Sequence, residues 1–292
     1  YSLPPLLCYT GVTAWACLQC GFISGDKNVE IPAWLLGPTP VCSGTSSSSC
    51  SPAPAGPGSP NTDYVLFVTA ANTGSCGGST LAYALACQRD EFDKPTVGRT
   101  NICPSKIPTD PSEVPRLVGT VAHEVIHALG FSRSSWWRFR DIDTLEPQTP
   151  RDGLFRPAAQ HRIPFSCQGS SRTADMASTT TIEYFGERGM QKCTSNAQRA
   201  SVGDCVQKMV GPNTAAATQW YFGCPSIQGA ELENQPTTSC SLTGSHLDQR
   251  IFPGCVMTPI IDYKGKEEGE LLVKVVPMLI LRECATRMDL WY

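Results

Sequence analysis

The segment VGTVAHEVIHALGF, residues 118–131, contains the spacing that decides the fold of this chain. It places His123, Glu124 and His127 in the pattern H-E-x-x-H. On an α-helix, residues four apart lie on one face, about 6 Å apart along the axis. Two imidazoles so placed can reach one tetrahedral Zn²⁺ at roughly 2.0–2.1 Å. Glu124 would then stand beside the metal, where it can take a proton from a metal-bound water.

The sequence around this pattern predicts a helix. A capping residue, a first-turn proline and a terminating glycine are present as Asp110 or Ser112, Pro115 and Gly130. Apolar side chains recur at helical spacing at Val114, Val118, Val121, Val125 and Leu129. We therefore expect a buried helix with a few polar residues on one side. A core helix with two incidental histidines is the alternative, because so short a pattern also recurs by chance.

Length, composition and charge limit the class of protein. The 292 residues suffice for one large domain or two lobes around a cleft, and the 41% that are apolar suffice for a core. The net charge of -3 excludes the basic surface that binds nucleic acid or an anionic membrane. The longest apolar run, residues 271–281, is interrupted by Lys274 and Pro277 and is too short to span a bilayer. We expect no nucleic-acid partner and no membrane span in this chain, which opens on Tyr1 as a processed or truncated product would.

Fifteen cysteines are scattered singly along the chain. This distribution favours disulfides over metal clusters and predicts an extracellular or cell-surface protein of the secretory pathway. Cys17 and Cys20 form the single C-x-x-C, and a zinc ribbon would need a second pair. Because the count is odd, we expect one free thiol, unless its partner lies outside this chain.

Before the motif, the chain alternates strands with helices. Residues 63–70, DYVLFVTA, predict a buried strand, and residues 96–103 predict a second strand at a sheet edge that flanks a cleft. An extended peptide could add itself to such an edge. Residues 43–62 are uncharged and low in complexity, so we expect a solvated surface loop tethered by Cys42 or Cys50.

After Gly130 the pattern is weaker. We expect short helices at residues 179–188 and 194–208, a helix at 215–223 and a final helix at 277–288. The cysteines expected to pin the loops of this part are Cys193, Cys205, Cys224, Cys240, Cys255 and Cys284.

A catalytic zinc site needs three protein ligands and an open position. Outside the predicted helix, the chain has two histidines, His161 and His246. Met257 follows His246 by eleven residues, and a histidine before a tight turn with methionine is typical of Met-turn zinc proteases. Glu146, nineteen residues after the motif, is the alternative ligand, although its proline-flanked, acidic surroundings favour a solvated loop. We interpret His161 as a surface histidine.

The longer pattern H-E-x-x-H-x-x-G-x-x-H is typical of metzincin proteases, and residues 123–130 match its first eight positions. Its third histidine position holds Arg133, which cannot bind the metal, so the third ligand must follow a long insertion. With this departure, the sequence resembles the leishmanolysin family of metzincins, closest to its invadolysin-like (leishmanolysin-like peptidase) branch. The resemblance runs from about Thr62 to Tyr292. It rests on TDYVLFVTA (62–70), CGGSTLAYALACQ (76–88), HEVIHALGFS (123–132), FRDIDTLEPQTPRD (139–152), YFGCPSIQGAELENQ (221–235), GSHLDQR (244–250) and VMTP (256–259).

The resemblance implies a zinc endopeptidase that is secreted or surface-bound, made as a zymogen and active on proteins or peptides. It makes His123, His127 and His246 the ligands of one Zn²⁺. It makes Glu124 the catalytic base and Met257 the structural residue of the Met-turn.

The resemblance also implies a fold, an α+β metzincin-like catalytic module. The N-terminal lobe, residues 1–131, would hold a twisted mixed sheet and helices, including the motif helix. The C-terminal lobe, residues 132–292, would be mostly loops and helices with disulfides and would carry the third ligand and the Met-turn.

A disulfide-rich cell-adhesion or protein-binding module with an inactive protease site is the competing hypothesis. The intact Glu124 argues against it, because that residue has no role in holding metal. Peptide hydrolysis that a chelator abolishes would separate the two hypotheses.

Overall fold

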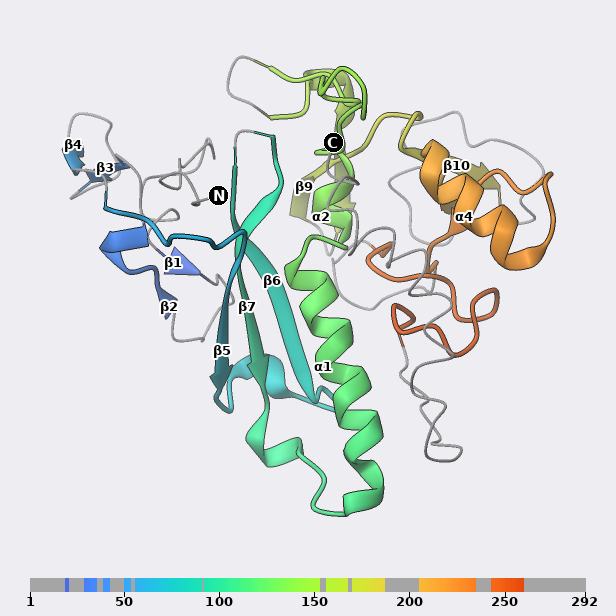
Figure 1. Ribbon diagram of the computed structural model, residues 1–292. Coiled ribbons are helices and arrows are strands. Elements are labelled where there is room, and N and C mark those ends of the chain that lie inside the picture. Colours follow the sequence, from blue (N-terminus) through green and yellow to red (C-terminus); the bar gives the residue numbers. More distant parts are fainter. Residues whose placement is uncertain are drawn as a thin grey trace. The chain divides into compact units, whose positions relative to one another are not determined.

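The computed structural model divides the chain into two compact units, Tyr1–Gly130 and Phe131–Tyr292, which are described separately (Figure 1). The structure describes residues 19–20, 29–35, 39–42, 50–53, 56–90, 92–152, 156–167, 170–186, 205–234 and 243–259. Both units contain strands as well as helices, which confirms the predicted α+β class.

A three-stranded mixed sheet forms the centre of the first unit. Its strands are β5 (Val65–Ala70), β6 (Ala82–Arg89) and β7 (Pro95–Ile102), in the order β5-β7-β6. β5 and β7 run parallel, whereas β6 and β7 run antiparallel. The predicted strand at residues 96–103 is therefore confirmed as a strand, but its predicted edge position is wrong. β7 uses its hydrogen bonds on both sides and is almost wholly buried, and β6 is an edge of this sheet.

Helix α1 (Val114–Ala128) carries the motif and packs on β6 and β7 (Figure 1). The predicted helix is confirmed, but its buried face differs from the predicted valine stripe. Val114 and Val118 are exposed, whereas the buried residues are Thr120, His123, Glu124 and Ala128. These four lie at helical spacing along one side of the helix, and two of them belong to the motif.

The ends of α1 follow the predicted signals with one change. Asp110 accepts a hydrogen bond from the backbone of Ser112 at 2.9 Å, and so caps the short 3-10 helix η6 (Pro111–Glu113) that precedes α1. At the other end, Gly130 has a φ of 105° and donates its N–H to the carbonyl of His127 at 2.9 Å. This left-handed conformation, which glycine adopts without strain, stops the helix.

Tyr64 ties the last turn of α1 to the sheet. Its hydroxyl donates to the carbonyl of Ala128 at 2.8 Å. Gly98 on β7 leaves the space for this hydroxyl, because a Cβ atom at that position would collide with it. Burial raises the pKa of Tyr64 well above its ordinary value. The glycine and the tyrosine therefore act as a pair that fixes how α1 meets β7.

The described residues of the first unit also form two short ladders and two disulfides. β1 (Gln19–Cys20) pairs with β2 (Val29–Glu30), and β3 (Thr39–Cys42) pairs with β4 (Cys50–Ala53). The disulfides join Cys20 to Cys87 and Cys76 to Cys103. Three further 3-10 helices are described, η2 (Ala33–Leu35), η4 (Gly74–Cys76) and η5 (Pro104–Lys106). The predicted loop at residues 43–62 is wrong where β4 crosses it, and residues 43–49 and 54–55 lie outside the described residues.

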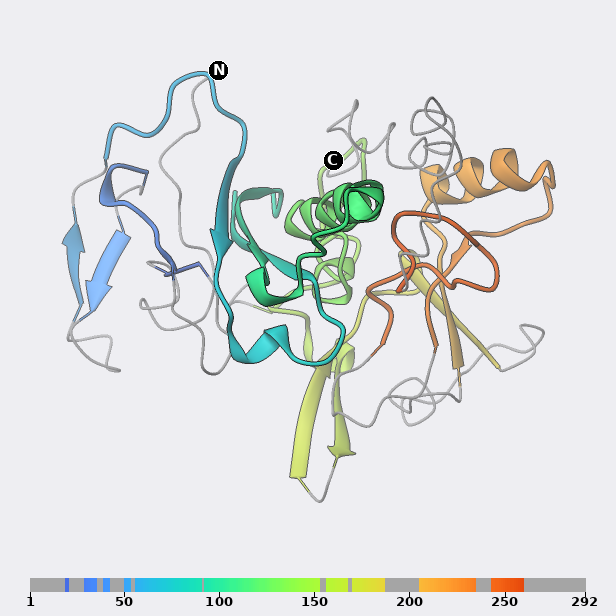
Figure 2. The same ribbon diagram turned by 90° about the horizontal axis from the view of Figure 1, so that it is seen from below.

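In the second unit, the residues that the structure describes form two antiparallel sheets. β8 (Arg162–Cys167) and β9 (Ser170–Asp175) form a hairpin, seen in yellow-green in Figure 2. β10 (Ile182–Gly186), β11 (Cys205–Met209) and β12 (Ala230–Glu231) form the other sheet in that order. The helices in the described part of this unit are α2 (Arg133–Trp136), η7 (Ala159–His161) and α4 (Pro212–Phe222).

The predicted helix at 179–188 is wrong, because β10 lies within it. The predicted helix at 194–208 is wrong at residues 205–208, which belong to β11, and residues 194–204 lie outside the described residues. Ile182, Tyr184 and Phe185 are buried in β10, and β-branched and aromatic side chains favour such a half-buried pleated surface. The predicted helix at 215–223 is confirmed by α4, which ends at Gly223 with a φ of 61°. The predicted helix at 277–288 lies outside the described residues.

The cysteines of the second unit also correct the prediction. Cys205 is disulfide-bonded, but Cys224 and Cys255 are free thiols. The expected single unpaired cysteine is therefore wrong, and these two residues do not pin loops. Among the described helices, none is long and apolar enough to cross a membrane.

Candidate metal centre

His123 and His127 lie on the same face of α1, as the four-residue spacing predicts. Their ring centroids are 4.5 Å apart and the rings are perpendicular. His123 is buried and His127 is half-buried. One turn of a rigid helix therefore presents two imidazoles together, which is the arrangement that lets a pair of histidines bind one metal ion.

Glu124 lies between these two histidines in the sequence and is also buried. Burial raises the pKa of its carboxyl group to about 7, while a hydrogen bond with the backbone of Ala84 on β6 opposes this shift. The helix thus holds the carboxylate against the edge strand of the sheet. Chemically, it is a group that can accept and release a proton.

His246 lies in a loop that its neighbours hold through the backbone. Its carbonyl accepts the N–H of Glu233 at 2.8 Å, beside a bridge between Leu232 and Leu247. The N–H of Leu247 donates to the carbonyl of Met257 at 2.8 Å. Met257 is fully buried, so the turn that bears this methionine lies directly against the histidine loop.

Glu233 is the residue of this region that the sequence analysis missed. Its Oε1 lies 2.8 Å from Nδ1 of His246 and accepts the backbone N–H groups of Ser245 at 3.0 Å and Gly244 at 3.3 Å. Burial alone would raise the pKa of Glu233, but these hydrogen bonds together hold it below its ordinary value. No sequence spacing marks this contact, because a loop brings together two residues that are thirteen positions apart.

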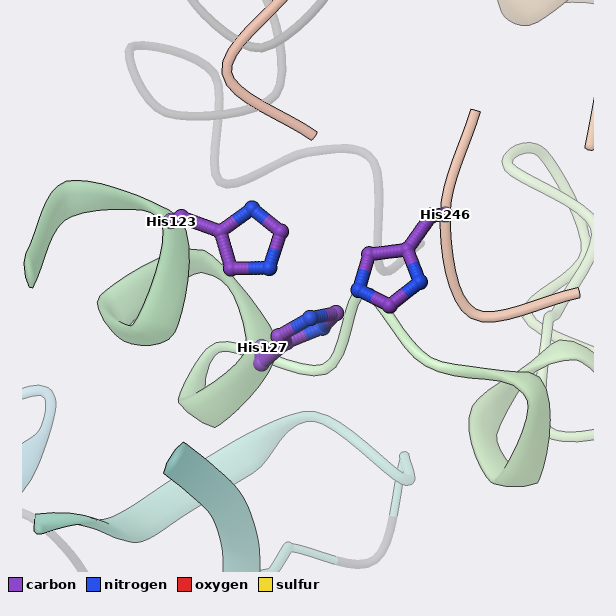
Figure 3. Close-up of side chains that lie close together, drawn as sticks. All are labelled: His123, His127 and His246. Atoms are coloured by element: carbon purple, nitrogen blue, oxygen red, sulfur yellow. The ribbon is translucent and has the colours of Figure 1, made fainter. Parts of the chain in front are cut away.

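The described residues contain a group that could hold a metal ion, formed by His123, His127 and His246 (Figure 3). Their ligand nitrogen atoms all lie within 4.8 Å of one another. Imidazole nitrogens suit zinc, and three of them leave a position open in a tetrahedral site. The donor set therefore fits Zn²⁺.

The two rival residues do not belong to this group. Glu146 is exposed and lines a pocket of about 770 Å³ that also includes Asp141 and Glu183. His161 ends the short helix η7, and its carbonyl accepts the N–H of Met176 at 2.8 Å. Both stand apart from the three-histidine group.

Arg133, which stands at the third histidine position of the metzincin pattern, has a different role. Its side chain is half-buried, and one guanidinium nitrogen lies 3.0 Å from the sulfur of Met176. Burial lowers the pKa of this guanidinium from its ordinary value. Its backbone N–H donates to the hydroxyl of Ser245 at 3.2 Å, so the residue supports the loop of His246.

Comparisons with known proteins agree with this motif. A family model described as leishmanolysin matches residues 38–155. The leishmanolysin-like peptidase of Drosophila pseudoobscura pseudoobscura is 34% identical over 246 residues, which cover 82% of this chain and 33% of the relative. The leishmanolysin-like peptidase of Caenorhabditis elegans is 34% identical over 205 residues, 70% of this chain and 28% of the relative. A ciliated left-right organizer metallopeptidase of Mus musculus is 26% identical over 208 residues, 70% of this chain and 24% of the relative. The chain thus spans about a third or less of the length of these curated relatives.

Proposed function

We propose that this chain, which is similar to leishmanolysin-like peptidases, is a zinc-dependent endopeptidase of the leishmanolysin family that hydrolyses peptide bonds in proteins or peptides. The observation that carries the proposal is the three-histidine group together with the intact Glu124. His123, His127 and His246 would hold one Zn²⁺ ion.

The mechanism assigns a separate step to each residue. Zn²⁺ in this position would supply a Lewis acid for the scissile carbonyl and would lower the pKa of water. Glu124 accepts the proton of the attacking water and then donates it to the leaving amine. Met257, a buried and polarizable side chain, supports the histidine loop. Among the described strands of its sheet, β6 lies at an edge, along which an extended substrate could bind.

The proposal is tested with purified chain and a library of fluorogenic peptides. We expect about one zinc ion per chain and peptide hydrolysis that a chelator abolishes and added zinc restores. A chain that binds zinc stoichiometrically but cleaves no peptide of the library would contradict the proposal and favour the cell-adhesion or binding module.

We also propose that the protein acts outside the cell or at its surface. The disulfides Cys20–Cys87 and Cys76–Cys103 support this location, because such bonds persist in oxidising compartments. Thiol titration of the denatured, unreduced protein should detect few free sulfhydryls, with Cys224 and Cys255 among them. Six or more would argue against the location.

A further inference from the structure

We infer that Glu233 is the positioning residue for His246, and that its carboxylate sets which ring nitrogen of His246 binds the metal. This inference rests on the proposed zinc site. It adds a residue that does not touch the metal but determines how one of its ligands is presented.

The geometry around one carboxylate oxygen carries the inference. Oε1 of Glu233 lies 2.8 Å from Nδ1 of His246 and also accepts the N–H groups of Ser245 and Gly244. The side chain of Glu233 is 12% exposed and that of His246 is 22% exposed, so the contact is largely shielded from water. A carboxylate only accepts hydrogen bonds, so Nδ1 must carry the proton in this contact.

When Nδ1 carries the proton, Nε2 keeps a free lone pair and is the ring nitrogen that can bind a metal ion. The hydrogen bond of one imidazole nitrogen decides which nitrogen is left to bind a metal. Carboxylates that hold a metal-binding histidine in this way fix both the tautomer and the ring orientation, and their loss typically weakens metal affinity about 10–100-fold. Glu233 is placed to do both for His246.

The loop of His246 has supports other than Glu233. The indole N–H of Trp136 donates to the carbonyl of Gly244 at 2.8 Å, and Ser245 accepts the backbone N–H of Arg133 at 3.2 Å. Gly244 has a φ of 108°, and a Cβ atom there would press on the amide of Gln207. Loss of the Glu233 carboxylate should therefore leave the loop folded while it frees the imidazole.

Glu231 provides a matched control. It lies two residues earlier, on β12, and its carboxylate faces Lys208 at 4.0 Å and Arg250 at 3.7 Å. Both glutamates are half-buried acids of the same segment, but the carboxylate of Glu233 is the one that contacts His246. A general effect of charge in this segment would appear in both variants.

The first test is zinc affinity of the full 292-residue chain, measured by competition with a chelator at pH 7. We expect Glu233→Ala to bind zinc about 10–100-fold more weakly than the wild type. Glu233→Gln should lose less, because its amide oxygen can still accept from Nδ1 but has no charge. Glu231→Gln should stay within about 2-fold of the wild type, since it leaves the imidazole contact unchanged. Circular dichroism of the zinc-free proteins verifies that each variant is folded. If Glu233→Ala does not fold, the comparison is made with Glu233→Gln instead.

The second test measures the tautomer of His246 and needs neither zinc nor enzymatic activity. Long-range ¹H–¹⁵N spectra of the zinc-free chain at pH 8.5, assigned through His246→Ala, should show a proton on Nδ1 of His246. In Glu233→Ala the population should move toward the tautomer protonated on Nε2. A role confined to packing would not move this signal.

The outcomes separate the two proposals. If Glu233→Ala keeps wild-type zinc affinity and tautomer while His246→Ala loses zinc, the positioning role is overturned and the ligand set stands. If His246→Ala also keeps zinc, the proposed ligand set fails and the positioning role fails with it.

Discussion

At the residue scale, Glu124 is the group on which the proposed chemistry depends. Glu124→Ala should bind zinc stoichiometrically, because all three histidines remain, but should hydrolyse peptides about 10²–10⁴-fold more slowly without its base. Zinc analysis and kcat/KM on the same sample check this expectation. Glu113→Ala is the control, since Glu113 pairs with Arg116 at the exposed start of the helix. Near-normal hydrolysis by Glu124→Ala would rule out the role of base.

Tyr64 gives a prediction about pH at the same scale. Its pKa is raised in the folded chain by burial, whereas in the unfolded chain it is about 10. The neutral hydroxyl therefore contributes its full stability below pH 10, and this contribution is lost as the pH rises above that value. The free energy of unfolding, measured in urea, should fall between pH 9 and 11 in the wild type. It should fall less in Tyr64→Phe, which is about 1 kcal/mol less stable at neutral pH for want of the hydrogen bond to Ala128. If the unfolding free energies of the two proteins depended equally on pH, the raised pKa of Tyr64 would be contradicted.

At the scale of elements, the packing of α1 on β7 depends on the absence of a side chain at Gly98. Gly98→Ala should destabilise the chain by about 1–3 kcal/mol, because the new methyl group meets the hydroxyl of Tyr64. The double variant with Tyr64→Phe should recover part of this loss, since the colliding atom is gone. Gly77→Ala is the control, where the added Cβ meets an ordinary contact of 3.7 Å. Denaturant unfolding of the wild type, the two single variants at Gly98 and Tyr64 and the double variant gives the coupling free energy between these two positions. Strictly additive changes in unfolding free energy would disprove the collision.

The elements also show which parts of the fold a sequence can predict. The motif helix was predictable because Pro115 in its first turn, Gly130 after its end and the helical spacing of apolar residues all indicate a helix, although its buried face is not the valine stripe. β10 was not, because Ile182, Tyr184 and Phe185 become a strand through pairing with β11, a partner that no local pattern identifies. The edge position of β6 was missed for the same reason, since strand order is a property of the whole sheet.

At the scale of the whole molecule, zinc should couple to folding. Added zinc should raise the Tm of the wild type and of Glu146→Ala, and raise that of His246→Ala less, because a ligand stabilises the state that presents the complete site. Thermal unfolding with and without zinc measures the three shifts. Loss of the shift in Glu146→Ala, with retention in His246→Ala, would replace the histidine by the carboxylate as third ligand.

The site was predictable to the extent that its chemistry restricts residue types. Two histidines four apart and a distant histidine followed by Met257 suggest a ligand set, since few side chains bind zinc. Glu233 could not be found in this way, because any of the chain's acidic residues could accept a hydrogen bond from an imidazole. Its role depends on a loop conformation that brings Gly244 and Ser245 to the same oxygen.

The two free thiols differ enough to be told apart by chemical labelling. Hydrogen bonds from the hydroxyl and backbone of Ser226 lower the pKa of Cys224, whereas burial raises that of Cys255 to about 11. At pH 8 only roughly a thousandth of Cys255 is thiolate, so iodoacetamide should alkylate Cys224 far faster, as peptide mapping by mass spectrometry would show. Equal alkylation rates would contradict this ranking. Among the cysteines that the structure describes, Cys224 is therefore the position to which a fluorophore could be attached, just beyond the end of α4, to report on the second unit.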